Sequence, residues 1–154
     1  MASNESAEMT HQDPVWRDRG DFIIGATVPN AERPTEEQLW ARQLTGSTFE
    51  LCCIPFFLYD LALGDVLETD ADYLVSRVVS RSGRFAFRVW FGDGDHPRFE
   101  VTSELADLGA LLEWSSENLL AVDASDRAHA DRVADVLLRH ETAGHLVYET
   151  AQSV

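Results

Sequence analysis

The sequence predicts an α+β protein. A small β-barrel or curled antiparallel sheet, over about residues 38–91, joins a ferredoxin-like βαββαβ half over about residues 84–150. Before residue 91, short runs of alternating apolar and polar residues are separated by glycine-containing turns, which is typical of antiparallel strands. After residue 97, helical spacing alternates with short strands in the order of a split βαβ unit.

The domain organisation follows from length and composition. At 154 residues the chain can bury a sizeable core without a disulfide or a metal ion. Residues 1–37 are polar and are predicted to form a partly disordered N-terminal arm, although "FIIGATV" at 22–28 is either a strand or a segment laid on the body. Residues 38–154 are then a single domain made of a β-rich subdomain (38–91) and a ferredoxin-like subdomain (84–150).

The first half contains the strand signals. "LWARQL" (39–44) and "TFELCCI" (48–54) flank a Thr-Gly-Ser turn and predict a hairpin. "VLETD" (66–70) predicts a third strand, and "YLVSRVVS" (73–80) and "RFAFRVWF" (84–91) predict a second hairpin across Arg-Ser-Gly. In the last run the phenylalanines share one face with a valine, whereas Arg84, Arg88 and Trp90 share the other. That second face is either amphipathic surface or the floor of a cleft.

The second half contains the helix signals. Ser103 could cap a short helix that ends at Gly109, and "ALLEWSS" (110–116) and "NLLAVDA" (118–124) predict two strands. Ser125 or Asp126 caps the best predicted helix, whose apolar face repeats at intervals of three and four. "HLVYET" (145–150) predicts the last strand.

The charge balance excludes several classes of partner. Twelve arginines and no lysines oppose 27 acidic residues, which gives a net charge of −15. This negative field disfavours nucleic acid and anionic membrane surfaces and favours a basic protein or a positively charged small molecule. The N-terminus lacks the basic start and apolar stretch of a signal peptide, and no run is long enough to span a membrane, so a cytoplasmic location is expected.

Residues 54–70, "IPFFLYDLALGDVLETD", are the least ordinary stretch, because a dense aromatic run stands beside two acids in a turn-rich segment. The aromatics either close one end of the barrel or line a ligand pocket with apolar walls and a few polar groups. In the second case Phe57, Tyr59, Arg77, Arg88 and Trp90 would bind the ligand. For a catalytic site, the candidates are Asp65 or Asp60 as the base and Tyr59 as the proton donor.

The remaining reactive residues do not form a recognisable centre. Cys52 and Cys53 are adjacent, which suits neither a disulfide nor a metal, and at most one of them should be exposed. His140 and His145 miss the spacing of a helical zinc pair, so no metal site is predicted. The sequence contains no phosphate-binding glycine loop or nucleophile elbow, and therefore indicates no cofactor.

The pattern Ile-Pro-Phe-Phe-x-Tyr-x-Leu-Ala-x-Gly-Asp-Val at 54–66 resembles the signature of an uncharacterised bacterial domain family that is frequent in actinobacteria. "LWAR" (39–42), "VVSRSG" (78–83) and "LLAVDA" (119–124) match the surroundings of that signature, so the resemblance spans roughly residues 38–150. The family pattern more often has Gly at the position of Asp60 and Tyr at that of Leu63. The resemblance supports the architecture and implies no activity.

Two functions lead at this stage, beside a third possibility of a purely structural subunit in which the apolar 54–59 run is an oligomer contact. The first is a non-catalytic binding or regulatory protein that engages a basic protein or a small molecule. The second is a small cofactor-free acid–base enzyme of the isomerase, cyclase or hydrolase type, in a specialised metabolic or peptide-modification pathway. The oligomeric state is not specified by the sequence.

Overall fold

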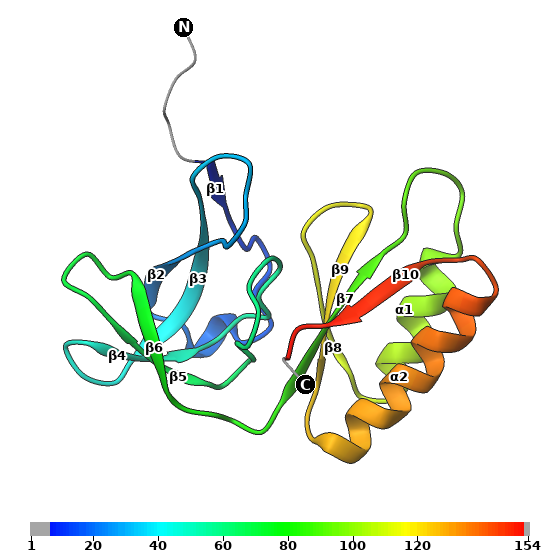
Figure 1. Cartoon of the computed structure of the whole chain (residues 1–154). Coiled ribbons are helices and arrows are strands. Elements are labelled where there is room, and N and C mark those ends of the chain that lie inside the picture. The colour runs from blue at the N-terminus through cyan, green and yellow to red at the C-terminus, as the bar shows by residue number, and fades with distance from the viewer. Residues whose placement is uncertain (1–6, 153–154) are drawn as a thin grey trace, which may run out of the picture.

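The computed structural model describes residues 7–152, which form two sheets and a pair of helices (Figure 1). The first sheet contains β1 to β6, with the 3-10 helix η1 between β1 and β2. The second contains β7 to β10, with α1 and α2 on its outer face. The elements are β1 (Ala7–Met9), η1 (Arg17–Arg19), β2 (Phe22–Thr27), β3 (Thr35–Gln43), β4 (Thr48–Leu51), β5 (Val66–Thr69), β6 (Val75–Ser80), β7 (Phe85–Trp90), α1 (Arg98–Asp107), β8 (Leu111–Trp114), β9 (Leu119–Ala124), α2 (Arg127–Thr142) and β10 (Val147–Thr150).

The first sheet is curled and is not a closed barrel. Its strand order is β1-β3-β4-β5-β6, and β2 pairs along the other edge of β3. The predicted hairpin of β3 and β4 is confirmed. At the open seam, β2 approaches the start of β6 through a single bridge between Gly25 and Leu74, with no continuous ladder among residues 7–152. Of the two predicted alternatives, the curled sheet is therefore correct.

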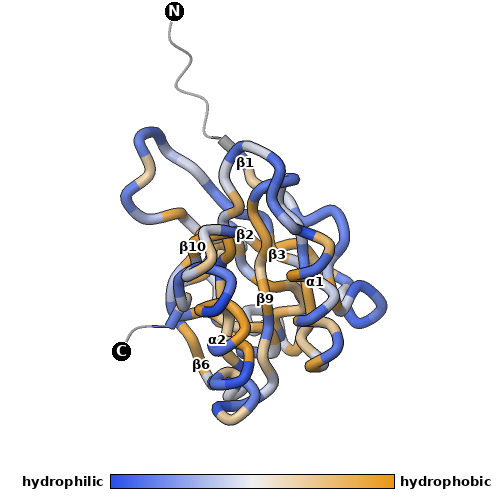
Figure 2. Tube along the Cα trace, turned by 90° about the vertical axis from the view of Figure 1, so that its right-hand side faces the viewer, coloured by the Kyte–Doolittle hydropathy of each residue, from blue (hydrophilic) through white to orange (hydrophobic). Residues whose placement is uncertain are grey.

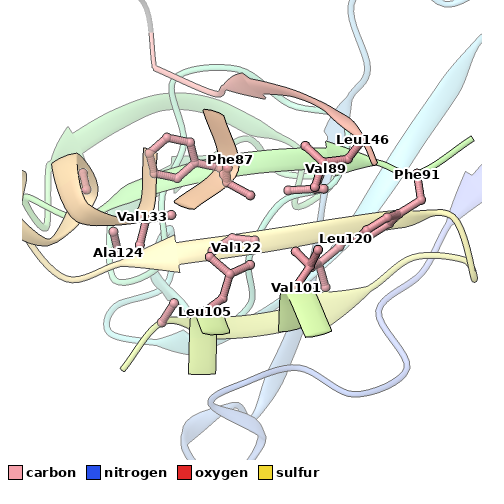
Figure 3. Packing of buried hydrophobic residues seen from close by; sticks show 13 residues of the cluster. Phe87, Val89, Phe91, Val101, Leu105, Leu120, Val122, Ala124, Val133 and Leu146 are labelled. Carbon is pink, nitrogen blue, oxygen red and sulfur yellow. The ribbon is translucent and has the colours of Figure 1, made fainter. Parts of the chain in front are cut away.

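The second sheet has the antiparallel order β10-β7-β9-β8. The face toward α1 and α2 carries the largest core cluster, in which Val101 and Leu105 of α1 pack beside Leu120 and Val122 of β9 (Figure 3). Hydrophobic residues gather along the interior strand β9, and the outer loops are largely hydrophilic (Figure 2). No helix within residues 7–152 is long and apolar enough to cross a membrane.

The two helices differ in how well their starts could be predicted. Asp126 caps α2 as expected, because its carboxylate accepts the N–H of His129. The cap predicted at Ser103 is wrong, since α1 already begins at Arg98, directly after Pro97. The Arg98 guanidinium donates to the carbonyl of Gly92 in the preceding loop and to that of Glu117 between β8 and β9, and these contacts fix the start of the helix.

The predicted hairpin of β6 and β7 is also wrong, because these strands belong to different sheets. The connection between them is fastened to the 60–65 loop instead of turning back. The Ser82 N–H donates to the Asp65 carboxylate, and the Ser82 hydroxyl donates to the carbonyl of Leu63. Arg81 donates to the carbonyl of Asp60. These bonds direct the chain from the first sheet across to the second.

Within the predicted N-terminal arm (1–37), the described part is integral to the first sheet. Residues 7–27 contain β1, η1 and β2, whereas residues 1–6 lie outside the described range. The segment between β1 and β2 is fixed by backbone bonding of Trp16 to Cys52 and by a buried histidine, His11. The run "FIIGATV" is thus a strand, which resolves the alternative left open by the sequence.

A buried ion network joins the N-terminal segment to both sheets. His11 lies between Glu37 of β3 and Glu113 of β8, with Nε2 at 2.6 Å from one carboxylate and Nδ1 at 2.8 Å from the other. All three residues are buried. Burial alone lowers the pKa of His11, but the Cys53 side chain and the hydrogen bonds with Glu113 and Glu37 outweigh it and raise that pKa to about 12. A protonated imidazole donates from both nitrogens, as these two acceptors require.

The raised pKa of His11 makes the stability of the fold depend on pH. Below about pH 6.5, the pKa of His11 in the unfolded chain, the stabilisation is complete; it is lost progressively as the pH rises toward the folded pKa of about 12. Between about pH 6.5 and about pH 8.5 the free energy of unfolding should fall by about 1.4 kcal/mol per pH unit. Urea unfolding of the wild type and of His11→Gln measures this slope, and equal slopes would show that the folded His11 is neutral.

Candidate functional site

A cleft of about 560 Å³ lies between the first sheet and the face of the second sheet that the helices leave uncovered. Its walls are mainly apolar and aromatic, with a few polar side chains. The lining residues are Met9, Val28, Pro29, Asn30, Ala31, Thr35, Phe56, Phe57, Tyr59, Arg88, Trp90, Leu119, Val147, Tyr148 and Glu149. These residues come from both halves of the chain, so the cleft exists only when the two sheets are docked.

The alternation of β7 explains why this cleft has an arginine and a tryptophan. Phe87 and Val89 face the helices, so Arg88 and Trp90 face the opposite way, toward the first sheet. The Arg88 side chain is only 8% exposed, whereas Trp90 is 46% exposed. The face that the sequence left as either surface or cleft floor therefore contributes to a cleft wall.

Three polar side chains form a connected group in the cleft. Arg88 Nη1 donates to Glu149 Oε1 at 3.3 Å, and the hydroxyl of Tyr59 donates to the same oxygen at 3.0 Å. The guanidinium carbon of Arg88 also lies 4.5 Å from the centre of the Tyr59 ring, which is a cation–π contact. The hydrogen bond to Glu149 raises the pKa of Tyr59.

The Arg88 guanidinium is incompletely paired. Its Nε and Nη2 atoms are buried and have no hydrogen-bond partner among the described residues. Leaving a buried charged donor without an acceptor costs free energy, so this group is the least satisfied part of the cleft.

The backbone of the aromatic run is fixed by the buried glutamates. Glu113 accepts the N–H of Ile54, and Glu37 accepts the N–H groups of Phe56 and Phe57, both at 2.8 Å. Pro55, between Ile54 and Phe56, has no N–H to satisfy. In addition, the Phe56 ring stacks on the His11 ring with centroids 4.0 Å apart. The segment thus presents its aromatic side chains from a rigid backbone.

The predicted ligand-binding residues fall into two groups. Phe57, Tyr59, Arg88 and Trp90 all line the cleft. Arg77 does not; its exposed side chain pairs with Glu68 on the neighbouring strand. It lies instead on an adjacent hollow of about 440 Å³, which Tyr59 and Asp60 also line. Arg77 points there because it sits on β6, which belongs to the first sheet.

Of the predicted catalytic residues, only Tyr59 lies in the cleft. Asp65 is buried elsewhere, and its two oxygens accept the N–H groups of Ala62 and Ser82 at 2.9 and 2.8 Å. Asp60 has a positive φ of 61°, a conformation that favours glycine, the residue that the resembled family pattern has there. The structure therefore keeps Asp65 out of the cleft that Tyr59 lines, whereas Asp60 and Tyr59 both line the adjacent hollow of about 440 Å³.

Both cysteines are buried, so neither is exposed as a nucleophile. Burial raises the pKa of Cys52 to about 11 and also raises the pKa of Cys53. Thiols with raised pKa values are poor nucleophiles near neutral pH. No group of three or more His, Cys, Asp or Glu side chains within residues 7–152 is placed to hold a metal ion.

Sequence reasoning missed Glu149 and the part of the cleft formed by the 28–31 loop. Glu149 lies opposite Arg88 in the register of β10 and β7, and an opposite-charge cross-strand pair is the signal that could have found it. The loop carried no such signal, because its residues reach the cleft only through the docking of the sheets.

These features define an α+β domain in which a curled sheet and a helix-covered sheet enclose a ligand-sized cleft. The chain belongs to the family described as "Domain of unknown function (DUF4265)", which matches residues 37–148. This confirms the predicted membership in an uncharacterised domain family.

One solved structure shows the same fold. It is the crystal structure of a hypothetical protein from Neisseria gonorrhoeae, which is similar over 86% of this chain and 96% of that chain, with a TM-score of 0.70 and 20% sequence identity. At this identity the likeness concerns the fold alone. No curated protein matches the chain.

The bonding of Asp65 predicts a structural effect of its substitution. In Asp65→Asn one of the two backbone N–H groups loses its acceptor and faces an amide donor, which should cost about 1–3 kcal/mol of unfolding free energy. Thermal unfolding should therefore show a melting temperature lower by roughly 2–12 °C. The exposed Asp72→Asn is the matched control and should melt like the wild type. An unchanged melting temperature of Asp65→Asn would contradict this structural role of Asp65.

Proposed function

We propose that this protein is a non-catalytic binding domain that holds a small, largely apolar molecule in the cleft between its two sheets. The observation that carries the proposal is the cleft of about 560 Å³ with aromatic walls and one connected polar group. Small-molecule sites typically have volumes of about 300–1,000 Å³, apolar linings and a few placed polar groups.

The exposed aromatic surface supports this proposal energetically. Tyr59 is 50% exposed and Trp90 is 46% exposed, although both stand in a concave region where a ligand could cover them. Covering apolar surface contributes about 25 cal/mol per Å². A flat aromatic or alicyclic body would therefore gain free energy by stacking between these rings.

The rigidity of one wall further supports binding. The Phe56 and Phe57 amides are bound to Glu37, so the aromatic wall needs little ordering when a ligand arrives. A preorganised site loses less conformational entropy on binding than a flexible one. The same bonds make residues 54–57 a credible family signature, which is how we interpret the Ile-Pro-Phe-Phe motif.

The second half supports a finer inference about architecture. We infer that residues 84–150 form a ferredoxin-like unit, because β7-α1-β8-β9-α2-β10 follow one another with the strand order β10-β7-β9-β8. Helices on one face leave the other face of the sheet free to form the cleft.

The other predicted functions have less support from the geometry. For an acid–base enzyme, the predicted base Asp65 is occupied by two backbone amides, and the other predicted base, Asp60, lines the adjacent hollow and not the cleft. A basic protein partner is favoured by the net charge of −15 alone, which bears on solubility before it bears on a particular partner.

Binding in the cleft predicts a differential effect of two tryptophan substitutions. The neutral fluorescent probe N-phenyl-1-naphthylamine should bind the wild type, and Trp90→Ala should weaken its affinity about tenfold, since an aromatic contact contributes about 1.4 kcal/mol. Trp114→Ala removes a comparably exposed ring that does not line this cleft and should leave the affinity unchanged. Fluorescence titration measures both. Equal affinities for all three proteins, or no binding to the wild type, would contradict the proposal.

A further inference from the structure

The cleft contains an arginine whose charge is only partly neutralised. The Arg88 side chain is 92% covered, yet of its three nitrogens only Nη1 has a hydrogen-bond partner among the described residues. Arginine donates five N–H groups in a planar fork that matches a carboxylate in bidentate geometry. The guanidinium thus has unused donors that a planar oxyanion would satisfy.

The existing partner of Arg88 is weakly placed. Glu149 is half exposed, and its 3.3 Å contact with Nη1 is longer than the 2.7–2.9 Å of a strong charge-assisted bond. The contact uses one nitrogen and one oxygen, so it is not bidentate. Glu149 can therefore turn toward solvent at little cost, taking with it the acceptor of the Tyr59 hydroxyl.

We propose that the ligand of this cleft is an aromatic or alicyclic carboxylate, and that Glu149 occupies its place on Arg88 in the free protein. This inference rests on the proposed binding function and adds the chemical class of the ligand. The ligand carboxylate displaces Glu149 and binds Arg88 through Nη1 and Nη2, while the apolar body lies against Trp90 and Tyr59. Glu149 thus acts as an internal competitor that sets the affinity.

The charges around the cleft favour a carboxylate over a phosphate. Among the described residues that line the cleft, Arg88 is the only basic one, and the overall charge is −15. A doubly charged phosphate needs several donors and is repelled more strongly by this field than a singly charged group. One arginine with an aromatic wall suits a monoanion with an apolar body.

The test uses 2-naphthoate and its neutral amide, 2-naphthamide, as probes that share one apolar body. Isothermal titration calorimetry on the wild type should show tighter binding of the carboxylate. Arg88→Met keeps the apolar stem and should weaken 2-naphthoate binding by about 10- to 100-fold, as expected for a lost charge-assisted bond. Binding of 2-naphthamide should change little. Glu149→Gln should strengthen 2-naphthoate binding several-fold because it removes the competitor.

The Arg77–Glu68 pair supplies matched controls. It is also a cross-strand ion pair, but it lies outside the cleft. Arg77→Met and Glu68→Gln change the net charge equally and should leave both affinities unchanged, which separates a local effect from a general electrostatic one. Circular dichroism shows whether Arg88→Met folds. If it does not, two other measurements test the carboxylate assignment: the ratio of the wild-type affinities for 2-naphthoate and 2-naphthamide, and the change in 2-naphthoate affinity in Glu149→Gln.

The outcomes also separate this inference from the proposed function. If the wild type binds 2-naphthoate and 2-naphthamide with equal affinity, and Glu149→Gln changes neither affinity, the carboxylate assignment is overturned. The cleft then remains a binding site for neutral molecules. Failure of both naphthalene probes and of N-phenyl-1-naphthylamine to bind would overturn the proposed function itself.

Discussion

The fold depends on one buried interaction, the protonated His11 held between Glu37 and Glu113. These residues come from the N-terminal segment, the first sheet and the second sheet, so the three parts meet at a single imidazole. A buried charge is tolerated only when it is paired and hydrogen-bonded, and removing one member leaves the others uncompensated. The network therefore selects one relative placement of the two sheets and disfavours others.

That placement creates the cleft. Besides binding His11, the two carboxylates accept the backbone N–H groups of Ile54, Phe56 and Phe57. Glu37 Oε2 is shared by His11 and Phe56, whereas the other two N–H groups use the oxygens that do not contact His11. Polar backbone groups of an irregular segment are thereby satisfied inside the protein, where water cannot reach them. The aromatic side chains of the segment can then cover a sheet face or line a cavity, which answers why such a run stands in a turn-rich region.

Local patterns predicted local structure well, and contacts distant in sequence account for the errors. The α2 helix could be predicted because its cap and its apolar spacing lie within one segment. The β6–β7 hairpin could not be excluded, since the bonds from Ser82 to the 63–65 region are invisible in the sequence of the turn. The His11–Glu113 contact spans 102 residues, and no spacing rule connects such partners. The aromatic side of the cleft was predictable from composition, whereas its completion by Glu149 required the register of β10.

Arg77 and Arg88 have similar sequence surroundings, and comparing them shows which features favour a ligand-binding site at Arg88. Arg77 and Arg88 both alternate with apolar residues on a strand, and both face a glutamate across a ladder. Arg77 is exposed and makes two bonds to Glu68, so water and its partner satisfy it fully. Arg88 is covered by the docking of the sheets and makes one hydrogen bond among residues 7–152, so burying its charge costs free energy in the free protein. The difference arises from the interface that His11 fixes, and it gives a ligand that brings an acceptor to Arg88 an advantage that the same ligand would not have at Arg77.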